Sequence, residues 1–126
     1  MDETPRANES ATQLVRRLAI AKAQAVQTDY PHALIIGSDQ CAVLGETILG
    51  KPHTHERAIE QLKASSGKRV EFLTGLCLLN THTNTYEVDV VSYAVQFRNF
   101  NEVIIENYLQ REQPYNCAGS FKSEGL

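Results

Sequence analysis

The sequence predicts an α/β fold, and three observations lead to this class. Apolar residues recur with helical spacing in some segments and with strand spacing in others, and the two kinds of segment are mixed along the chain. Two long strand-like segments flank a short polar connection, which is typical of a β-hairpin. The length of 126 residues and the hydrophobic fraction of 42% suit one globular domain. We therefore expect a mixed, twisted sheet that contains a long hairpin and is flanked by helices.

The first half of the chain predicts one helix and several short strands. Residues 10–28 place apolar side chains on one helical face, and Ser10 is a suitable N-cap. Residues 33–37 are apolar up to a glycine, which is typical of a strand buried on both faces in a parallel or mixed sheet. Three short features are expected next: a strand at 41–44, a turn at 45–46 and an extended segment at 47–49.

The second half predicts a hairpin with one helix on each side of it in the sequence. Thr54 caps a helix over residues 54–64, and Gly67 follows its end. Asn99, with Glu102 three residues later, resembles the capping box of a last helix.

The hairpin joins strands at 69–79 and 86–98 through residues 81–84. Apolar residues at even positions of its first strand predict one inward face. This face comprises Val70, Phe72, Thr74, Leu76 and Leu78.

Charge and cysteine content exclude several functional classes. The formal net charge is −3 and no basic run is present, so a nucleic-acid-binding surface is not expected. No apolar run is long enough to span a membrane. The odd number of cysteines, without a CxxC pair, favours reduced thiols and a cytoplasmic location over a disulfide framework or a zinc site. These cysteines are Cys41, Cys77 and Cys117.

Asp39 is the first candidate for chemistry. It follows an expected strand end by two residues, and ligands of open α/β sheets bind outside the carboxyl ends of the strands. A carboxylate at this place would hold Mg²⁺ or accept a proton from water. The alternative is that Asp39 forms a turn after Gly37-Ser38 and binds the local backbone.

Other charged residues have both a functional and a structural interpretation. Lys51, in a Gly-Lys-Pro loop, would bind phosphate or be a solvated turn residue. Lys22 would reach into a site or extend its ammonium to solvent from an apolar helix face. Glu3 precedes the first helix, where an acid favours the N-terminus electrostatically. Lys122 and Glu124 would ordinarily be exposed loop charges.

Six motifs occur in order along the chain and are more specific together than singly. They are DETP at 2–5, LA with KA at 18–23, IGSDQ at 36–40, LGKP at 49–52, FLTG at 72–75 and CAGSFKSEG at 117–125. Over essentially the whole chain, this set resembles the Maf family of nucleoside triphosphate pyrophosphatases. The combination of GSDQ with SFKSEG is similar to the branch that hydrolyses 7-methyl-GTP.

The resemblance implies a reaction and a role for each candidate residue. Water would attack the α-phosphorus of 7-methyl-GTP, a modified nucleotide, and release the monophosphate and pyrophosphate. Asp39 would accept the proton and, with Glu3, hold a divalent cation, which would be Mg²⁺ or alternatively Mn²⁺ or Co²⁺. The implied substrate-binding residues are Lys22 and Lys51 on the phosphates, Gln40 and Glu124 on the base, and Lys122.

The family's pattern extends beyond both ends of the sequence. Its first strand and a Ser-x-Ser-Pro-x-Arg-Arg loop would precede Met1, and a further strand and helices would follow Leu126. We therefore expect residues 1–126 to form a single, incomplete domain without the N-terminal strand-loop-helix and the C-terminal part. The alternative function is that of a catalytically impaired fragment acting at most as a nucleotide-binding or interaction module. The resemblance also implies a homodimer.

Overall fold

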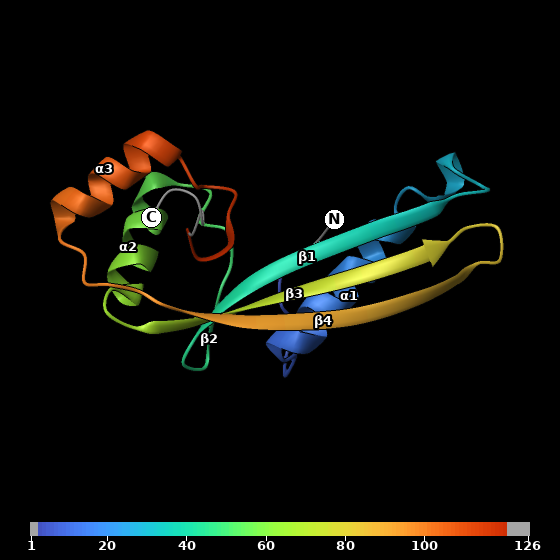
Figure 1. Ribbon diagram of the computed structural model, residues 1–126, viewed down its shortest axis with the longest axis horizontal. Coiled ribbons are helices and arrows are strands. Elements are labelled where there is room, and N and C mark those ends of the chain that lie inside the picture. Colours follow the sequence, from blue (N-terminus) through green and yellow to red (C-terminus); the bar gives the residue numbers. More distant parts are fainter. Residues whose placement is uncertain (1–2, 121–126) are drawn as a thin grey trace. The chain divides into compact units, whose positions relative to one another are not determined.

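The computed structural model describes residues 3–120 and confirms an α/β fold (Figure 1). Its helices and strands are α1 (Ala11–Gln24), β1 (Leu34–Leu44), β2 (Thr47–Leu49), α2 (His55–Ser65), β3 (Arg69–Asn80), β4 (Thr85–Gln96) and α3 (Glu102–Glu112). Short 3₁₀ turns cover Gln27–Asp29 and Ala118–Ser120. No helix within residues 3–120 is both long and apolar enough to cross a bilayer.

The chain divides into two compact units. The first unit comprises the described residues up to Gln40 together with Leu73–Ser92. The second unit comprises Cys41–Phe72 together with the described residues from Tyr93 onward. That residues 1–126 form a single domain stays a prediction.

The strands are ordered β2-β1-β3-β4, and neighbouring strands run antiparallel. In β1 and β2, Ala42 lies opposite Leu49. Beyond the β1–β3 pairing, Thr81 N donates to Ala33 O at 3.0 Å. The long hairpin between β3 and β4 is confirmed, while the pairings among the described strands are antiparallel rather than mixed.

The two short strands expected at 33–37 and 41–44 are one continuous strand, β1. Gly37 lies inside β1 because the backbone of α1 approaches it closely. A Cβ on residue 37 would collide with the carbonyl oxygen of Ala19 and lie 2.7 Å from the nitrogen of Ala23. This glycine therefore allows helix-on-strand contact and does not end the strand.

Substitution of Gly37 by Ala should destabilise the first unit by about 1–3 kcal/mol, because α1 must move to admit a methyl group. Gly50→Ala is the matched control, since a Cβ there would meet no atom within 4 Å. The measurement is the urea midpoint of unfolding for each variant. Equal midpoints for Gly37→Ala and the wild type would contradict the close approach of α1.

The expectation that β1 is buried on both faces is wrong. Leu34 and Ile36 expose 66% and 74% of their surface. Gly37 and Asp39, on the other face, are buried beneath α1. Because side chains alternate along a strand, a helix on one face of the first unit leaves the other face open among the described residues.

The inward face predicted for β3 is only partly correct. Val70 and Phe72 are buried in the second unit, but Leu76 and Leu78 are exposed in the first. In the first unit the buried apolar positions of β3 are the odd ones, which include Cys77 and Leu79. The buried positions of β3 therefore change from even-numbered to odd-numbered residues along the strand, because its two ends contribute to two separate hydrophobic clusters.

Each unit has its own hydrophobic core. In the first unit, Ala19 and Ala23 of α1 pack with Cys77 and Leu79 of β3. The second unit has two clusters. One contains Ala42, Val70, Phe72, Phe97 and Ala118, and the other contains Ala58, Leu62, Ile105, Tyr108 and Leu109.

The helix boundaries follow their capping residues. Ser10 and Thr54 cap α1 and α2 as predicted, by accepting hydrogen bonds from backbone N–H groups in the first turns. The helix expected over 10–28 ends at Gln24. The last helix is capped by Asn101, not Asn99, because the Asn101 side chain accepts from the backbone N–H of the third helical residue.

Candidate active site

Lys22 joins two carboxylates in the first unit. Its Nζ lies 2.7 Å from Oδ1 of Asp39 and 2.8 Å from Oε1 of Glu3. Burial lowers the pKa of Lys22, but the hydrogen bonds to Asp39 and Glu3 outweigh that effect and raise the pKa above its usual value of 10.5. Lys22 is therefore an ammonium at neutral pH, held between two acids.

Secondary structure positions this cluster. Lys22 lies in the last turn of α1, and Asp39 lies on the β1 face that α1 covers. Asp39 is 8% exposed. It is inside the strand, not two residues past its end, so both the strand-end placement and the turn-forming interpretation are wrong. The strand continues through Gly37 because that glycine accommodates α1.

The side chain of Gln40 points to the face of β1 opposite Asp39, because neighbouring side chains alternate along a strand. Its Nε2 donates to Oγ1 of Thr74 on β3 at 3.0 Å. The sequence pattern predicts Thr74 only as a residue on the inward face of the first hairpin strand. Its pairing with Gln40 depends on the register of two strands that are distant in the sequence, so no local pattern indicates it.

The part of β1 that carries Asp39 and Gln40 lies beside β3. Within residues 3–120, β2 pairs only with Ala42–Leu44, so Asp39 and Gln40 have β3 as their single neighbouring strand.

Three predicted site residues remain, Lys51, Lys122 and Glu124. Lys51 belongs to the second unit, where it follows β2 in a half-buried position between Gly50 and the buried Pro52. Lys122 and Glu124 lie outside the described residues.

The described side chains can be compared with those that a divalent cation requires. Among residues 3–120, no group of three or more His, Cys, Asp or Glu side chains is placed to hold a metal ion. Glu3 and Asp39 do converge on one ammonium, so two carboxylates face the same point. Mg²⁺ is commonly held through one or two carboxylates plus substrate phosphates and water. The pair therefore fits a cation that arrives with a triphosphate.

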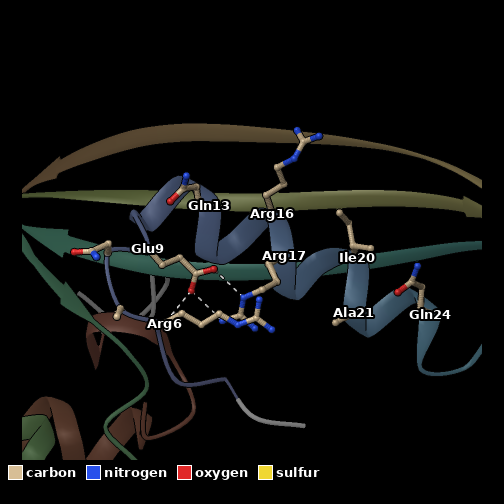
Figure 2. Close-up of a pocket in the computed structure, with 10 residues that line it drawn as sticks. Arg6, Glu9, Gln13, Arg16, Arg17, Ile20, Ala21 and Gln24 are labelled. Carbon is tan, nitrogen blue, oxygen red and sulfur yellow. Dashed lines mark hydrogen bonds and ion pairs between the residues drawn. The ribbon is translucent and has the colours of Figure 1, made fainter.

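A separate open hollow of about 610 Å³ lies along the outer side of α1 (Figure 2). At its centre Glu9 accepts two hydrogen bonds from the guanidinium of Arg17, at 2.8 and 3.0 Å, while Arg16 points away. The bond from Arg17, with a further bond from the backbone N–H of Arg6, lowers the pKa of Glu9 from 4.5 to about 2. None of the predicted site residues within residues 3–120 lines this hollow.

This ion pair should make stability depend on pH in the acidic range. The pKa of Glu9 is lower in the folded state, so its contribution is fully present above pH 4.5 and is lost as the pH falls toward about 2. Denaturant midpoints at several pH values should show that Glu9→Gln flattens this part of the profile. Glu87→Gln, at an exposed carboxylate of β4, is the control. A Glu9→Gln profile parallel to that of the wild type would contradict the assignment.

Comparison with known proteins gives a consistent result. The family model described as "Maf-like protein" matches residues 1–126. Proteins named 7-methyl-GTP pyrophosphatase are 60% identical in Pseudomonas savastanoi pv. phaseolicola (strain 1448A / Race 6), 59% in Nitrosococcus oceani and 56% in Alcanivorax borkumensis. Each match covers 100% of this chain and 66%, 63% and 64% of the respective relative. The chain thus spans slightly less than two thirds of the length of these relatives.

Proposed function

Because the chain belongs to the Maf family, we propose that it contributes the catalytic cluster of a nucleoside triphosphate pyrophosphatase. The proposed substrate is 7-methyl-GTP, after the name that its relatives carry. The observation that carries the proposal is the convergence of Glu3 and Asp39 on Lys22. A buried carboxylate can accept a proton from water, and an ammonium beside it can stabilise the negative charge of a phosphoric anhydride.

Asp39 is the proposed general base. Lys22 donates to Oδ1 of Asp39, so we assign Oδ2 as the atom that accepts the proton of the attacking water. The water oxygen forms a bond to the α-phosphorus, and the bond from that phosphorus to the α,β-bridging oxygen breaks. Pyrophosphate then leaves with the bonding electrons, and the monophosphate remains.

The reaction also needs positively charged groups near the substrate, because a triphosphate carries several negative charges on neighbouring phosphates. Lys22 and Lys51 are proposed to bind the phosphates, and the raised pKa of Lys22 keeps its ammonium charged at neutral pH. Glu3 and Asp39 would hold a divalent cation, which offsets phosphate charge when it is bound.

Selection of the base is proposed to depend on Gln40 and Glu124, with Lys122 as a further substrate contact. A carboxylate accepts hydrogen bonds from the N–H edge of guanine, and its charge suits the cationic 7-methyl form. Gln40 would act from the face of β1 opposite Asp39. A cytoplasmic location and pairing of two copies stay predictions.

The test is release of pyrophosphate from a panel of 7-methyl-GTP, GTP, dTTP and UTP, with and without Mg²⁺. We expect the highest kcat/KM for 7-methyl-GTP and a requirement for the cation. Equal rates for all four nucleotides would contradict the proposed substrate. Binding of 7-methyl-GTP without pyrophosphate release would instead favour the alternative, a nucleotide-binding module without turnover.

A further inference from the structure

A closed ring of hydrogen bonds in the second unit joins two loops. The carbonyl oxygen of Gly50 accepts from Nε2 of Gln61 at 2.9 Å and from the backbone N–H of Gly119 at 3.2 Å. Oε1 of Gln61 accepts from Oγ of Ser120 at 2.6 Å. Because residues 119 and 120 are consecutive, these three bonds close on themselves.

The ring uses both ends of one carboxamide. Only one orientation of the Gln61 side chain lets its nitrogen donate to a carbonyl and its oxygen accept from a hydroxyl. Gln61 lies on α2, so the amide is held by a helix and not by either loop.

The second loop is held in a demanding conformation. Gly119 and Ser120 have φ angles of 64° and 59°, in the left-handed region that a serine rarely adopts. Ser120 is fully buried, and its carbonyl oxygen accepts from the hydroxyl of Tyr108 at 2.8 Å. A non-glycine residue keeps such a backbone only where its surroundings fix it. Tyr108 and Gln61 fix Ser120 from its carbonyl and from its side chain.

We propose that Gln61 is a positioning residue that couples phosphate binding to base selection. Lys51 follows Gly50 directly, and Lys122 and Glu124 follow Ser120 after one and three intervening residues. A carboxamide that bonds to both Gly50 and Ser120 therefore joins the two described residues after which the proposed substrate-binding residues follow in the sequence. The inference rests on the proposed function, which supplies the roles of Lys51 and Glu124.

The first readout needs no nucleotide. In Gln61→Met, which neither donates to Gly50 nor accepts from Ser120, amide hydrogen exchange at Gly119 should rise about tenfold. Gln61→Glu should raise this exchange as well, because its carboxylate still accepts from Ser120 but has no donor for Gly50 and repels that carbonyl oxygen. Tyr115→Phe is the matched control. It removes a hydroxyl that lies 2.9 Å from Nδ1 of His55 on α2, outside the ring.

The second readout is selectivity between 7-methyl-GTP and GTP. Gln61→Met should lower kcat/KM for 7-methyl-GTP by about 10- to 100-fold, mainly through KM, and should lower the ratio of the two substrates. Ser120→Ala removes the donor to Gln61 and should reproduce this change, while Tyr115→Phe keeps the ratio. A residue that only supports the fold would reduce activity on both nucleotides equally.

The outcomes separate the inference from the function on which it rests. Unchanged exchange at Gly119 in Gln61→Met, or an unchanged substrate ratio, would overturn the coupling role. Wild-type protein that neither binds nor hydrolyses 7-methyl-GTP would overturn the proposed function, and exchange at Gly119 would then decide alone whether Gln61 fixes the two loops.

Discussion

Asp39→Asn should lower kcat for 7-methyl-GTP by about 10²–10⁴-fold, because the amide keeps the shape of the side chain but does not accept the proton of the attacking water. Asp39 is buried against α1 and forms an ion pair with Lys22. After the substitution, Glu3 is the one carboxylate of this cluster that still pairs with the Lys22 ammonium. KM should change less than kcat, since the lysines that we propose to bind phosphate are retained. Pyrophosphate release at saturating nucleotide is the measurement.

The matched control is Asp89→Asn, which changes the same residue type on an exposed site of β4 in the same unit. Its kcat should equal that of the wild type. Thermal unfolding of both variants shows whether loss of activity reflects loss of structure. An Asp39→Asn variant that keeps more than about a tenth of the wild-type kcat would remove Asp39 from proton transfer.

Leu79→Ala should reduce the free energy of unfolding by about 2–5 kcal/mol. Truncation of a fully buried leucine removes buried apolar area and leaves a cavity in the core. Leu79 is 1% exposed and packs with Ala19, Ala23 and Cys77 in the core of the first unit. The loss is a large share of the 5–15 kcal/mol that typically stabilises a domain. Urea unfolding followed by circular dichroism measures it.

Leu78→Ala is the control for this prediction, because it makes the same change one residue earlier in β3. Leu78 is 44% exposed, on the face that α1 does not cover. Its truncation should shift the free energy of unfolding by no more than about 0.5–1 kcal/mol. Equal destabilisation by the two substitutions would show that the buried face of β3 in the first unit is assigned incorrectly.

Local patterns predicted the parts of the fold that depend on neighbours in the sequence. Thr54 caps α2 because its side chain bonds a backbone N–H three residues later, and the polar connection at 81–84 turns the chain between β3 and β4. Motifs also indicated the candidate residues for chemistry, Asp39 and Lys22 among them, and their roles stay predictions. The continuity of β1 was missed, because a glycine followed by Ser38 resembles a strand end when the helix that packs on it is not known.

Sequence patterns were enough to predict the α/β class, the family and the candidate acids and lysines. Three contacts became visible only in the folded chain. Lys22 lies between Glu3 and Asp39, Gln40 bonds to Thr74 on the opposite face of β1, and Gln61 joins Gly50 to Ser120. The difference follows from how far apart in the sequence the interacting residues lie. Caps and turns are made within a few residues, whereas these contacts depend on strand register and on where each helix packs.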